Sequence, residues 1–475
     1  MAKSKVKKGF FYYLFVFLGL VFGVFCILAT ILIFNPGQDI YGIGIRFVQH
    51  TKGANYYYTT EENEALRTKL SQASYNKVKF TSDYANFNIS YNVDEYSTHV
   101  VFQPSITALS QTENVDLKLS ISVASGVLDI SVEEPDLWIG FSKNVNVYLV
   151  LPEGANFTNI DFDINTKSGA VQFGDTSDKA YEVKSLNITT ETGSIRLSEN
   201  LKVVSGTVNI KTQKSRIDID SNITGLLNIE NESGKVDINQ MSGSLRVESA
   251  NTLEINANKI GGDVYVNSTN GYISIKELGT TITNTGNVIG YVDQTTGQTI
   301  LGYLFGNFVA EKNLDNTNII IGKMTGDADI ESQSGYVTIE KLGKKADITT
   351  TSGNIQISNA YNNIDAVTTY GTINVTQHSN LAKTILISDS GKIIANFTEL
   401  GAAELTTKGD IDVNVKTGLA FKFVYNAKAI SVNWISTQLP LSGFVLVSGA
   451  VESTTTIVTA NSENGTVTLK DGFVA

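Results

Sequence analysis

Three pairs of aspartates, each separated by one residue, are the first candidates for chemistry in this sequence: Asp218/Asp220, Asp327/Asp329 and Asp410/Asp412. Residues two apart on a β-strand face the same side. Each pair could therefore bind a cation or act as an acid–base pair. All six also occupy the polar positions of alternating polar–apolar runs, where solvated side chains are expected. We expect a solvated surface here, and only charged side chains converging in a groove would favour an enzyme that acts on polysaccharides.

Other reactive residue types are few and scattered. The histidines, His50, His99 and His378, lie far apart in sequence, and the single cysteine, Cys26, falls in an apolar segment. No nucleophile elbow, zinc-protease or phosphate-loop motif is present. The sequons include Asn88, Asn156, Asn187, Asn222 and Asn396; in a chain this rich in Asn and Thr we assign them no role. The sequence predicts a protein that is not an enzyme, with no catalytic, cofactor-binding or metal-binding residues and no cofactor.

The segments that carry the aspartates are short alternating runs that follow a glycine. Two copies nine residues apart are Gly234-Lys-Val-Asp-Ile and Gly243-Ser-Leu-Arg-Val, and similar runs recur from Gly169 to Gly409. The spacing along Gly335, Gly353, Gly371, Gly391 and Gly409 is 18, 18, 20 and 18 residues. A period near 20 residues with two short strands per unit is typical of a solenoid.

A strand of this kind buries only one face, so it is stable only when equivalent strands stack on it. Val236 and Ile238 should point inward, while Lys235 and Asp237 point to water. Glycine should stand at the corners, where a positive φ is often needed, and a preceding Ser or Thr should bond the turn backbone. We predict an all-β, parallel β-solenoid of about 18–19 residues per coil, with about eleven coils over roughly 50 Å. An antiparallel sandwich would also alternate, but it has no reason to keep the period.

The N-terminus predicts a membrane anchor. Residues 9–34 carry no charge, and this run exceeds the roughly 20 residues needed to cross a bilayer as a helix. It is also longer than the core of a cleavable signal peptide, the alternative reading. Lys3, Lys5, Lys7 and Lys8 precede it, which places the N-terminus in the cytoplasm. The lipid bilayer is thus an expected partner through residues 9–34, and the body of the chain is expected outside the membrane.

The remaining segments divide around the repeats. Residues 1–8 form a basic tail, and 35–75 a stalk with a short helix marked by Leu66 and Leu70. Residues 76–155 are expected to be an N-terminal β cap, 156–415 the solenoid repeats, and 416–475 a C-terminal β cap. Residues 280–316 interrupt the period, with an apolar group of Tyr303, Leu304, Phe305 and Phe308. We expect a packed side loop or hairpin there rather than a binding face.

Residues 144–173 resemble a known family, the bacterial β-strand-repeat family labelled "putative adhesin", a domain of unknown function. The resemblance rests on Val145, Val147, Leu151, Pro152 and Gly154, on the following Lys167-Ser168-Gly169 unit, and on the final Gly465–Leu469 strand. It extends over roughly residues 76–470, with 280–316 departing from the pattern. It implies an envelope-exposed β-solenoid and brings no catalytic residues.

The charge excludes one class of partner. The net charge is −11, whereas nucleic-acid binding needs a basic surface. We expect a membrane-anchored, extracytoplasmic β-solenoid at the cell surface, a non-catalytic adhesin-like or envelope-structural protein whose partner is a surface glycan or an envelope protein. Two alternatives stay open: a polysaccharide-active β-helix enzyme, and an envelope-stress accessory protein whose short lysine-rich tail contacts cytoplasmic partners.

Overall fold

The computed structural model describes residues 15–24, 26, 46–51, 75–92, 99–110, 119–133, 139–152, 157–174, 181–199, 201–203, 207–279, 290–292, 299–301, 308–435, 439–451 and 454–473. The stalk helix predicted around Leu66 and Leu70, the group Tyr303–Phe305 and the sequon at Asn156 lie outside these residues.

One short helix is described, over residues 15–24, and it carries exposed apolar side chains such as Phe15 and Phe22. It falls inside the predicted anchor 9–34, most of whose other residues lie outside the described ranges. Within the described residues, no helix has both the length and the apolar character needed to span a membrane. The anchor therefore stays a prediction.

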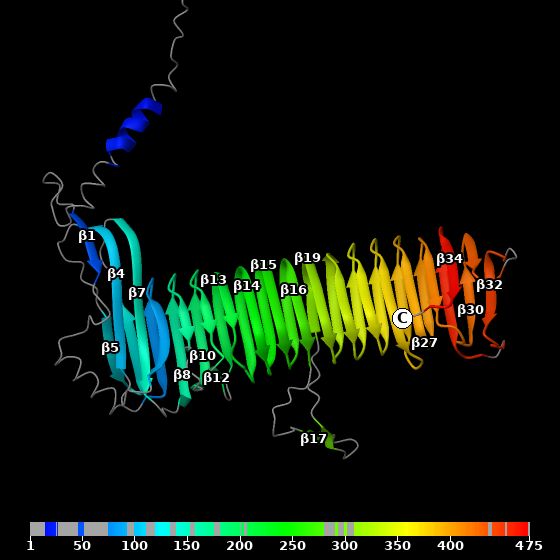
Figure 1. The fold of residues 1–475 in the computed structure, drawn as a ribbon, viewed down its shortest axis with the longest axis horizontal. Coiled ribbons are helices and arrows are strands. Elements are labelled where there is room, and N and C mark those ends of the chain that lie inside the picture. The colour runs from blue at the N-terminus through cyan, green and yellow to red at the C-terminus, as the bar shows by residue number, and fades with distance from the viewer. Residues whose placement is uncertain are drawn as a thin grey trace, which may run out of the picture.

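The body is a stack of coils in which 32 of the described strands form one hydrogen-bonded sheet with two rows (Figure 1). The first row, in spatial order, contains β5 (Leu119–Ala124), β6 (Val127–Val132), β2 (Lys77–Ser82), β8 (Phe157–Thr166), β10 (Tyr181–Thr190), β13 (Val208–Ile219), β14 (Leu226–Met241), β15 (Ser244–Ile260), β16 (Val264–Leu278), β19 (Phe308–Met324), β20 (Ala328–Ser334), β22 (Ala346–Thr350), β24 (Ile364–Thr368), β26 (Thr384–Ser388), β28 (Ala403–Thr407), β33 (Ile457–Ser462), β30 (Phe421–Asn426) and β32 (Ser442–Val447). At about 4.8 Å per strand, this row is roughly 80 Å long.

The second row lies across a thin core from the first. It contains β1 (Arg46–Thr51), β4 (His99–Ser110), β7 (Ile139–Pro152), β3 (Asn86–Asn92), β9 (Val171–Phe173), β11 (Ile195–Leu197), the C-terminal halves of β13 to β16 and β19, then β21 (Val337–Leu342), β23 (Ile355–Ala360), β25 (Ile373–Ser379), β27 (Ile393–Leu400), β29 (Ile411–Val415), β34 (Thr466–Asp471) and β31 (Ala429–Val432). The three-residue β12 (Leu201–Val203) pairs with the start of β10. The strands β13 to β16 and β19 run through both rows because no turn interrupts them at the corner.

The coils pair in parallel with their apolar residues in register. Val236 lies opposite Ile255, which lies opposite Ile273, and all three are buried. Such columns join into one core cluster along the stack. The prediction of an all-β, parallel, solenoid-like fold is thus confirmed. The predicted length is too short, because strands from both regions that were expected only to cap the stack extend the first row: β2 and β6 at one end, and β33 and β30 at the other.

Both ends of the stack depart from sequence order. The coil of β2 and β3 lies between β6/β7 and β8/β9, so a later part of the chain covers it. At the other end, β33 and β34 insert between β28/β29 and β30/β31. Antiparallel strands then cover the outer coils: β5 on β6, β4 on β7 and β32 on β30. An antiparallel strand at each end therefore pairs with the outermost parallel strand, whose free backbone groups could otherwise bind another chain.

Within the predicted insertion, β17 (Gly290–Val292) and β18 (Thr299–Leu301) pair antiparallel as a small hairpin (Figure 1). Phe308 does not belong with it. This residue begins β19, is fully buried, and lies in register between Val264 and Ala328 in the core. The apolar group read from the sequence is therefore divided between a core column and a segment outside the described residues.

The corner glycines serve a different purpose from the one expected. Gly193 and Gly391 do not have a positive φ, but a Cβ at either would lie 1.8–1.9 Å from the carbonyl oxygen of the equivalent glycine one coil earlier. The expectation of positive φ holds at Gly335, with φ +102°. Close approach of successive backbones, rather than turn geometry, thus explains most of the glycine repeat.

The predicted hydroxyl contact is present at these corners. The backbone N–H of Gly193 donates to Thr190 Oγ1 at 3.0 Å, and that of Gly391 donates to Ser388 Oγ at 2.8 Å. The hydroxyls lie in a buried column at the edge of the apolar core. They satisfy backbone groups that would otherwise be unpaired where the strand ends.

Candidate functional site

Asp218 faces outward from β13, Asp220 directly follows the end of that strand, and both line a groove of about 680 Å³ on the second row. Each aspartate has a basic partner. Arg216 Nε donates to Asp218 Oδ1 at 2.9 Å, and Arg196 lies 3.6 Å from Asp220. The pair predicted from the sequence is therefore in a hollow, but its charges are matched by neighbouring arginines.

The same groove continues into an ion-pair network across successive coils. Arg216 also reaches Asp237 at 3.0 Å, and Lys235 lies 2.9 Å from Glu254. The hydrogen bond to Asp218 raises the pKa of Arg216, and the hydrogen bond to Glu254 raises the pKa of Lys235. In return, Lys235 lowers the pKa of Glu254. These interactions hold the charged forms in place and favour a surface that stabilises the stack over one that exchanges protons near neutral pH.

In the other two aspartate pairs, the two members make different contacts. Asp327 Oδ1 accepts the backbone N–H of Lys345 at 3.0 Å, and Asp410 Oδ1 accepts that of Thr466 at 2.8 Å, in each case from the next coil. Asp412 forms an ion pair with Lys392 at 2.6 Å. The first member of each pair thus ties two coils together.

Asp329 instead begins a column of like charges. It lies in register with Asp347, which lies in register with Asp365. Burial raises the pKa of Asp365, and the negative charge of Asp347 raises it further. Like charges directly opposite one another repel, but Lys345 lies 3.3 Å from Asp347, and Lys345 and Lys383 both oppose the rise in the pKa of Asp365.

The structure does not bring the histidines together. His50 lies on β1 and His99 on β4, whereas His378 lies on β25 in the second half of the stack. The His378 ring stacks on Tyr361 at 5.2 Å, and its Nδ1 lies 2.7 Å from Thr398 Oγ1. Burial lowers the pKa of His378, opposed by the nearby Glu399. Of the described residues, no group of three or more His, Cys, Asp or Glu is placed to hold a metal ion.

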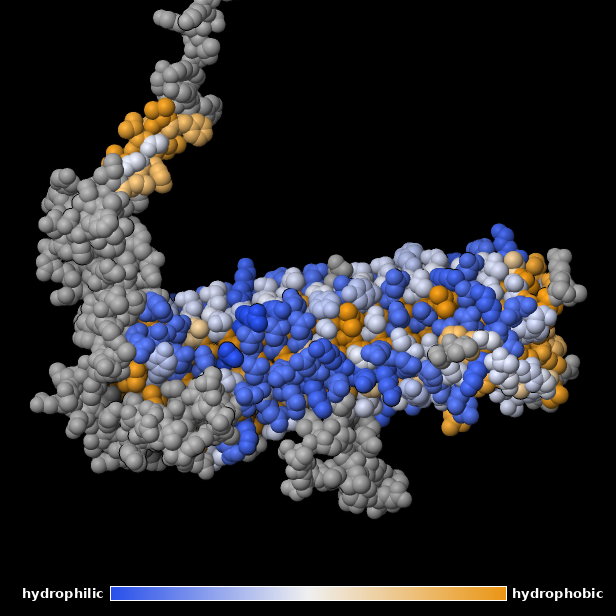
Figure 2. Space-filling model, viewed as in Figure 1, coloured by the Kyte–Doolittle hydropathy of each residue, from blue (hydrophilic) through white to orange (hydrophobic). Residues whose placement is uncertain are grey.

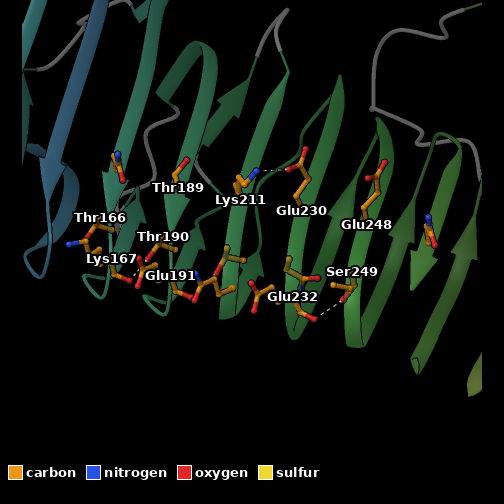
Figure 3. Close-up of a pocket in the computed structure, with 16 residues that line it drawn as sticks. Thr166, Lys167, Thr189, Thr190, Glu191, Lys211, Glu230, Glu232, Glu248 and Ser249 are labelled. Carbon is orange, nitrogen blue, oxygen red and sulfur yellow. Dashed lines mark hydrogen bonds and ion pairs between the residues drawn. The ribbon is translucent and has the colours of Figure 1, made fainter. Parts of the chain in front are cut away.

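A second hollow, which we call the axial groove, runs along the first row where the strands reach the corner (Figure 3). Its volume is about 650 Å³. One wall is a single column of residues in register from β8 to β16: Asn165, Thr189, Lys211, Glu230, Glu248 and Asn267. The other wall follows the corner itself: Lys167, Glu191, Gln213, Glu232 and Ala250. The groove thus repeats a polar side chain in each successive coil.

Some charges in the axial groove are paired and others are not. Lys211 lies 3.2 Å from Glu230, and Arg246 contacts Glu248. By contrast, the side chains of Asn165, Thr189, Glu191, Gln213, Glu232 and Asn267 make no hydrogen bond or ion pair with another described residue. The floor includes Asn231, which is 6% exposed and whose amide oxygen and nitrogen have no partner among the described residues.

The aspartate pairs in the sequence did not predict the axial groove, although the sequence contains a signal for it. The wall residues of the groove are 24, 22, 19, 18 and 19 positions apart, close to the coil period, whereas the aspartates of each pair are two positions apart. Stacking brings together residues one coil apart, so polar residues that recur at the coil period indicate this groove.

An apolar surface marks the C-terminal end of the stack (Figure 2). Its exposed side chains include Leu441, Phe444, Leu446, Val451 and Ile457. Lys422 Nζ lies 4.5 Å above the Phe444 ring and covers part of it. The outer face of β32 is thus apolar, in contrast to the polar outer faces of the coils before it.

Comparison with known proteins gives one family. Residues 88–285 match the family described as Toastrack DUF4097, a domain of unknown function. No curated protein matches the chain. A crystal structure of a "putative cell adhesion protein" from Clostridium sporogenes ATCC 15579 is similar over 84% of this chain and 94% of that chain, with 9% identity and a TM-score of 0.14, a likeness too weak to carry an argument. Residues 88–285 of this chain are thus similar to the Toastrack DUF4097 family, in agreement with the predicted resemblance to a β-strand-repeat family of unknown function.

Proposed function

We propose that this chain is a membrane-anchored surface protein whose solenoid lies outside the cytoplasmic membrane and acts by binding, as an adhesin-like or envelope-structural protein. The observation that carries the proposal is the single continuous stack of coils, which is held by one core cluster along its length. Such a stack is stiff, because every inward residue contacts its equivalents in the neighbouring coils. It suits presentation of a binding surface at a distance from an anchor.

Protease treatment of intact cells that express the full chain tests the location. We expect the protease to cleave the solenoid on intact cells. The proposal would be contradicted if the solenoid were protected in intact cells and cleaved in inverted membrane vesicles. Adherence of the same cells to purified envelope polysaccharides and to envelope protein tests the activity, and cells already treated with protease are the control. A solenoid that is accessible but binds none of these surfaces would contradict the adhesin-like role.

An enzyme that acts on polysaccharides is the second candidate, and the axial groove is the observation that favours it. Four glutamates and two lysines line this groove, and Glu230 lies in register with Glu248 on the next strand. Incubation of the full chain with linear polysaccharides, followed by assay for new reducing ends, separates the two candidates. A binding protein leaves the substrate intact, whereas an enzyme releases ends and loses this activity in Glu248→Gln.

A further inference from the structure

We propose that the axial groove binds an extended glycan chain that lies parallel to the solenoid axis, and that this glycan is uncharged or carries amino groups. The inference rests on the proposed function and names the site and the class of ligand.

The geometry of the groove fits a linear polymer. The wall column from Asn165 to Asn267 crosses six neighbouring strands, so it is roughly 24 Å long and offers one polar side chain about every 4.8 Å. An extended glycan advances by one sugar ring over a distance of the same order. Each ring would therefore meet an equivalent side chain of successive coils, with no rearrangement of the backbone.

The chemistry of the walls fits hydroxyl groups. Amide side chains at Asn165, Gln213 and Asn267 both donate and accept, and the carboxylates of Glu191 and Glu232 accept. The side chains of these five make no hydrogen bond or ion pair with other described residues, so binding would not have to break existing pairs. In the groove lined by Asp218, by contrast, Arg196 and Arg216 already form ion pairs with the aspartates.

The same residues exclude other linear polymers. Four glutamates outnumber two lysines in the axial groove, which disfavours anionic glycans and nucleic acids by repulsion. Ala250 is the one apolar side chain among the lining residues, so the anchor pockets that a bound peptide needs are lacking. An amino group on the glycan would gain a charge-assisted bond to Glu191 or Glu232.

The length of the groove sets how affinity depends on chain length. None of the described residues that line it is aromatic, so each sugar ring gains only hydrogen bonds that replace bonds to water, a small net gain. Affinity should therefore rise with each added ring until the groove is filled, at about five or six rings for a groove of roughly 24 Å. Longer chains should bind with little further gain.

Titration calorimetry on the full chain in detergent tests this with four hexasaccharides: cellohexaose, N-acetylated chitohexaose, its deacetylated form and hexagalacturonate. Binding of at least one of the first three, with hexagalacturonate at least tenfold weaker, is expected. Dimers and tetramers of the binding sugar should be weaker than the hexamer, and octamers equal to it. No binding by the three non-acidic hexamers, or preferential binding of hexagalacturonate, overturns the proposal.

Two matched pairs of variants locate the site. Thr189→Arg blocks the wall, and Thr406→Arg makes the same change at an exposed strand position on β28, outside the groove. Glu232→Gln removes a carboxylate that the bound glycan would use, and Glu463→Gln removes an exposed carboxylate at a corner of the stack outside the groove. Tenfold or greater loss of affinity is expected for the groove variants and less than twofold for their controls.

Equal loss in both members of a pair would place the site elsewhere and overturn the inference. A thermal unfolding midpoint equal to that of the parent chain confirms that each variant is folded. If cells that express the Thr189→Arg variant still adhere to envelope material, and the purified variant still binds the hexasaccharide normally, the groove assignment is overturned and the proposed function stands. If cells that express the unchanged chain do not adhere, the proposed function is overturned.

Discussion

A Cβ atom on Gly371 would lie 1.9 Å from the carbonyl oxygen of Gly353, its equivalent in the preceding coil. The same relation links Gly353 to Gly335, at 1.8 Å, and Gly391 to Gly371, at 1.8 Å. Successive corners therefore stack backbone on backbone, with no room for a side chain between them. Glycine recurs at these corners because the backbones of successive coils touch there, and this contact keeps the period regular.

Gly371→Ala should accordingly destabilise the solenoid by about 3 kcal/mol, at the upper end of the cost of overpacking. The alanine methyl group has to push two coils apart, because the atom it meets is backbone. Denaturant unfolding of the full chain measures the change. Tyr370→Ala, at the adjacent and 66% exposed position, is the control and should alter stability by less than about 0.5 kcal/mol. Equal stability of the glycine and alanine forms would show that the coils can separate without cost.

Thr368→Val should cost about 1–3 kcal/mol because it removes a buried hydroxyl that serves two backbone groups. Thr368 Oγ1 accepts the N–H of Gly371 at 3.0 Å and donates to the carbonyl of Gly353 at 3.2 Å. Thr368→Ser keeps both bonds and is the matched variant, with a smaller loss from the missing methyl group. Thermal unfolding of the two forms checks the order. A valine form as stable as the serine form would mean that water replaces the hydroxyl.

Asp365→Asn should stabilise the chain at pH 7 by about 0.5 kcal/mol, since it removes the repulsion between Asp365 and Asp347 at the end of the column. Burial, and then Asp347, raise the pKa of Asp365. A raised carboxyl pKa means that the folded state resists ionisation, so the cost is fully present above the folded pKa. It disappears as the pH falls below the unfolded value. The advantage of the asparagine form should therefore vanish in acid.

Asp412→Asn is the matched variant, for which we expect a change in stability of the opposite sign. Asp412 forms an ion pair with Lys392 at 2.6 Å, so its removal should lower stability at pH 7 rather than raise it. Urea unfolding of both variants between pH 3 and pH 8 makes the comparison. A stabilising effect of the same size at both positions would indicate a general effect of net charge, not the column.

Asn231→Thr should raise stability by about 1 kcal/mol, because a buried amide without partners is costly. Asn231 lies in register between Thr212 and Ser249, within the column of buried hydroxyls. A threonine there would match its neighbours. Thermal unfolding measures the change, with Ser249→Thr as the control for the added methyl group. A loss of stability would show that the amide holds a buried water molecule.

Sequence alone determined the parts of this fold that depend on local pattern. Alternation placed Val236 and Ile238 in the core and Lys235 on the surface, because successive side chains on a strand face opposite sides. The coil period placed equivalent residues in register, since each coil contacts only its neighbours. The predicted contact of a serine or threonine with the corner backbone, seen at Thr190 and Ser388, also needed no tertiary information.

The tertiary structure alone decided which coils meet at the ends and where the surface is hollow. The coil that contains Ile457 inserts ahead of the one that contains Phe421, yet both carry the same apolar alternation, so no local signal separates them. Glu191 and Glu232 face one groove only because stacking aligns coils whose lengths differ by a few residues. A repeated pattern fixes what each coil buries, whereas contacts between coils fix the order of stacking and the shape of the outer surface.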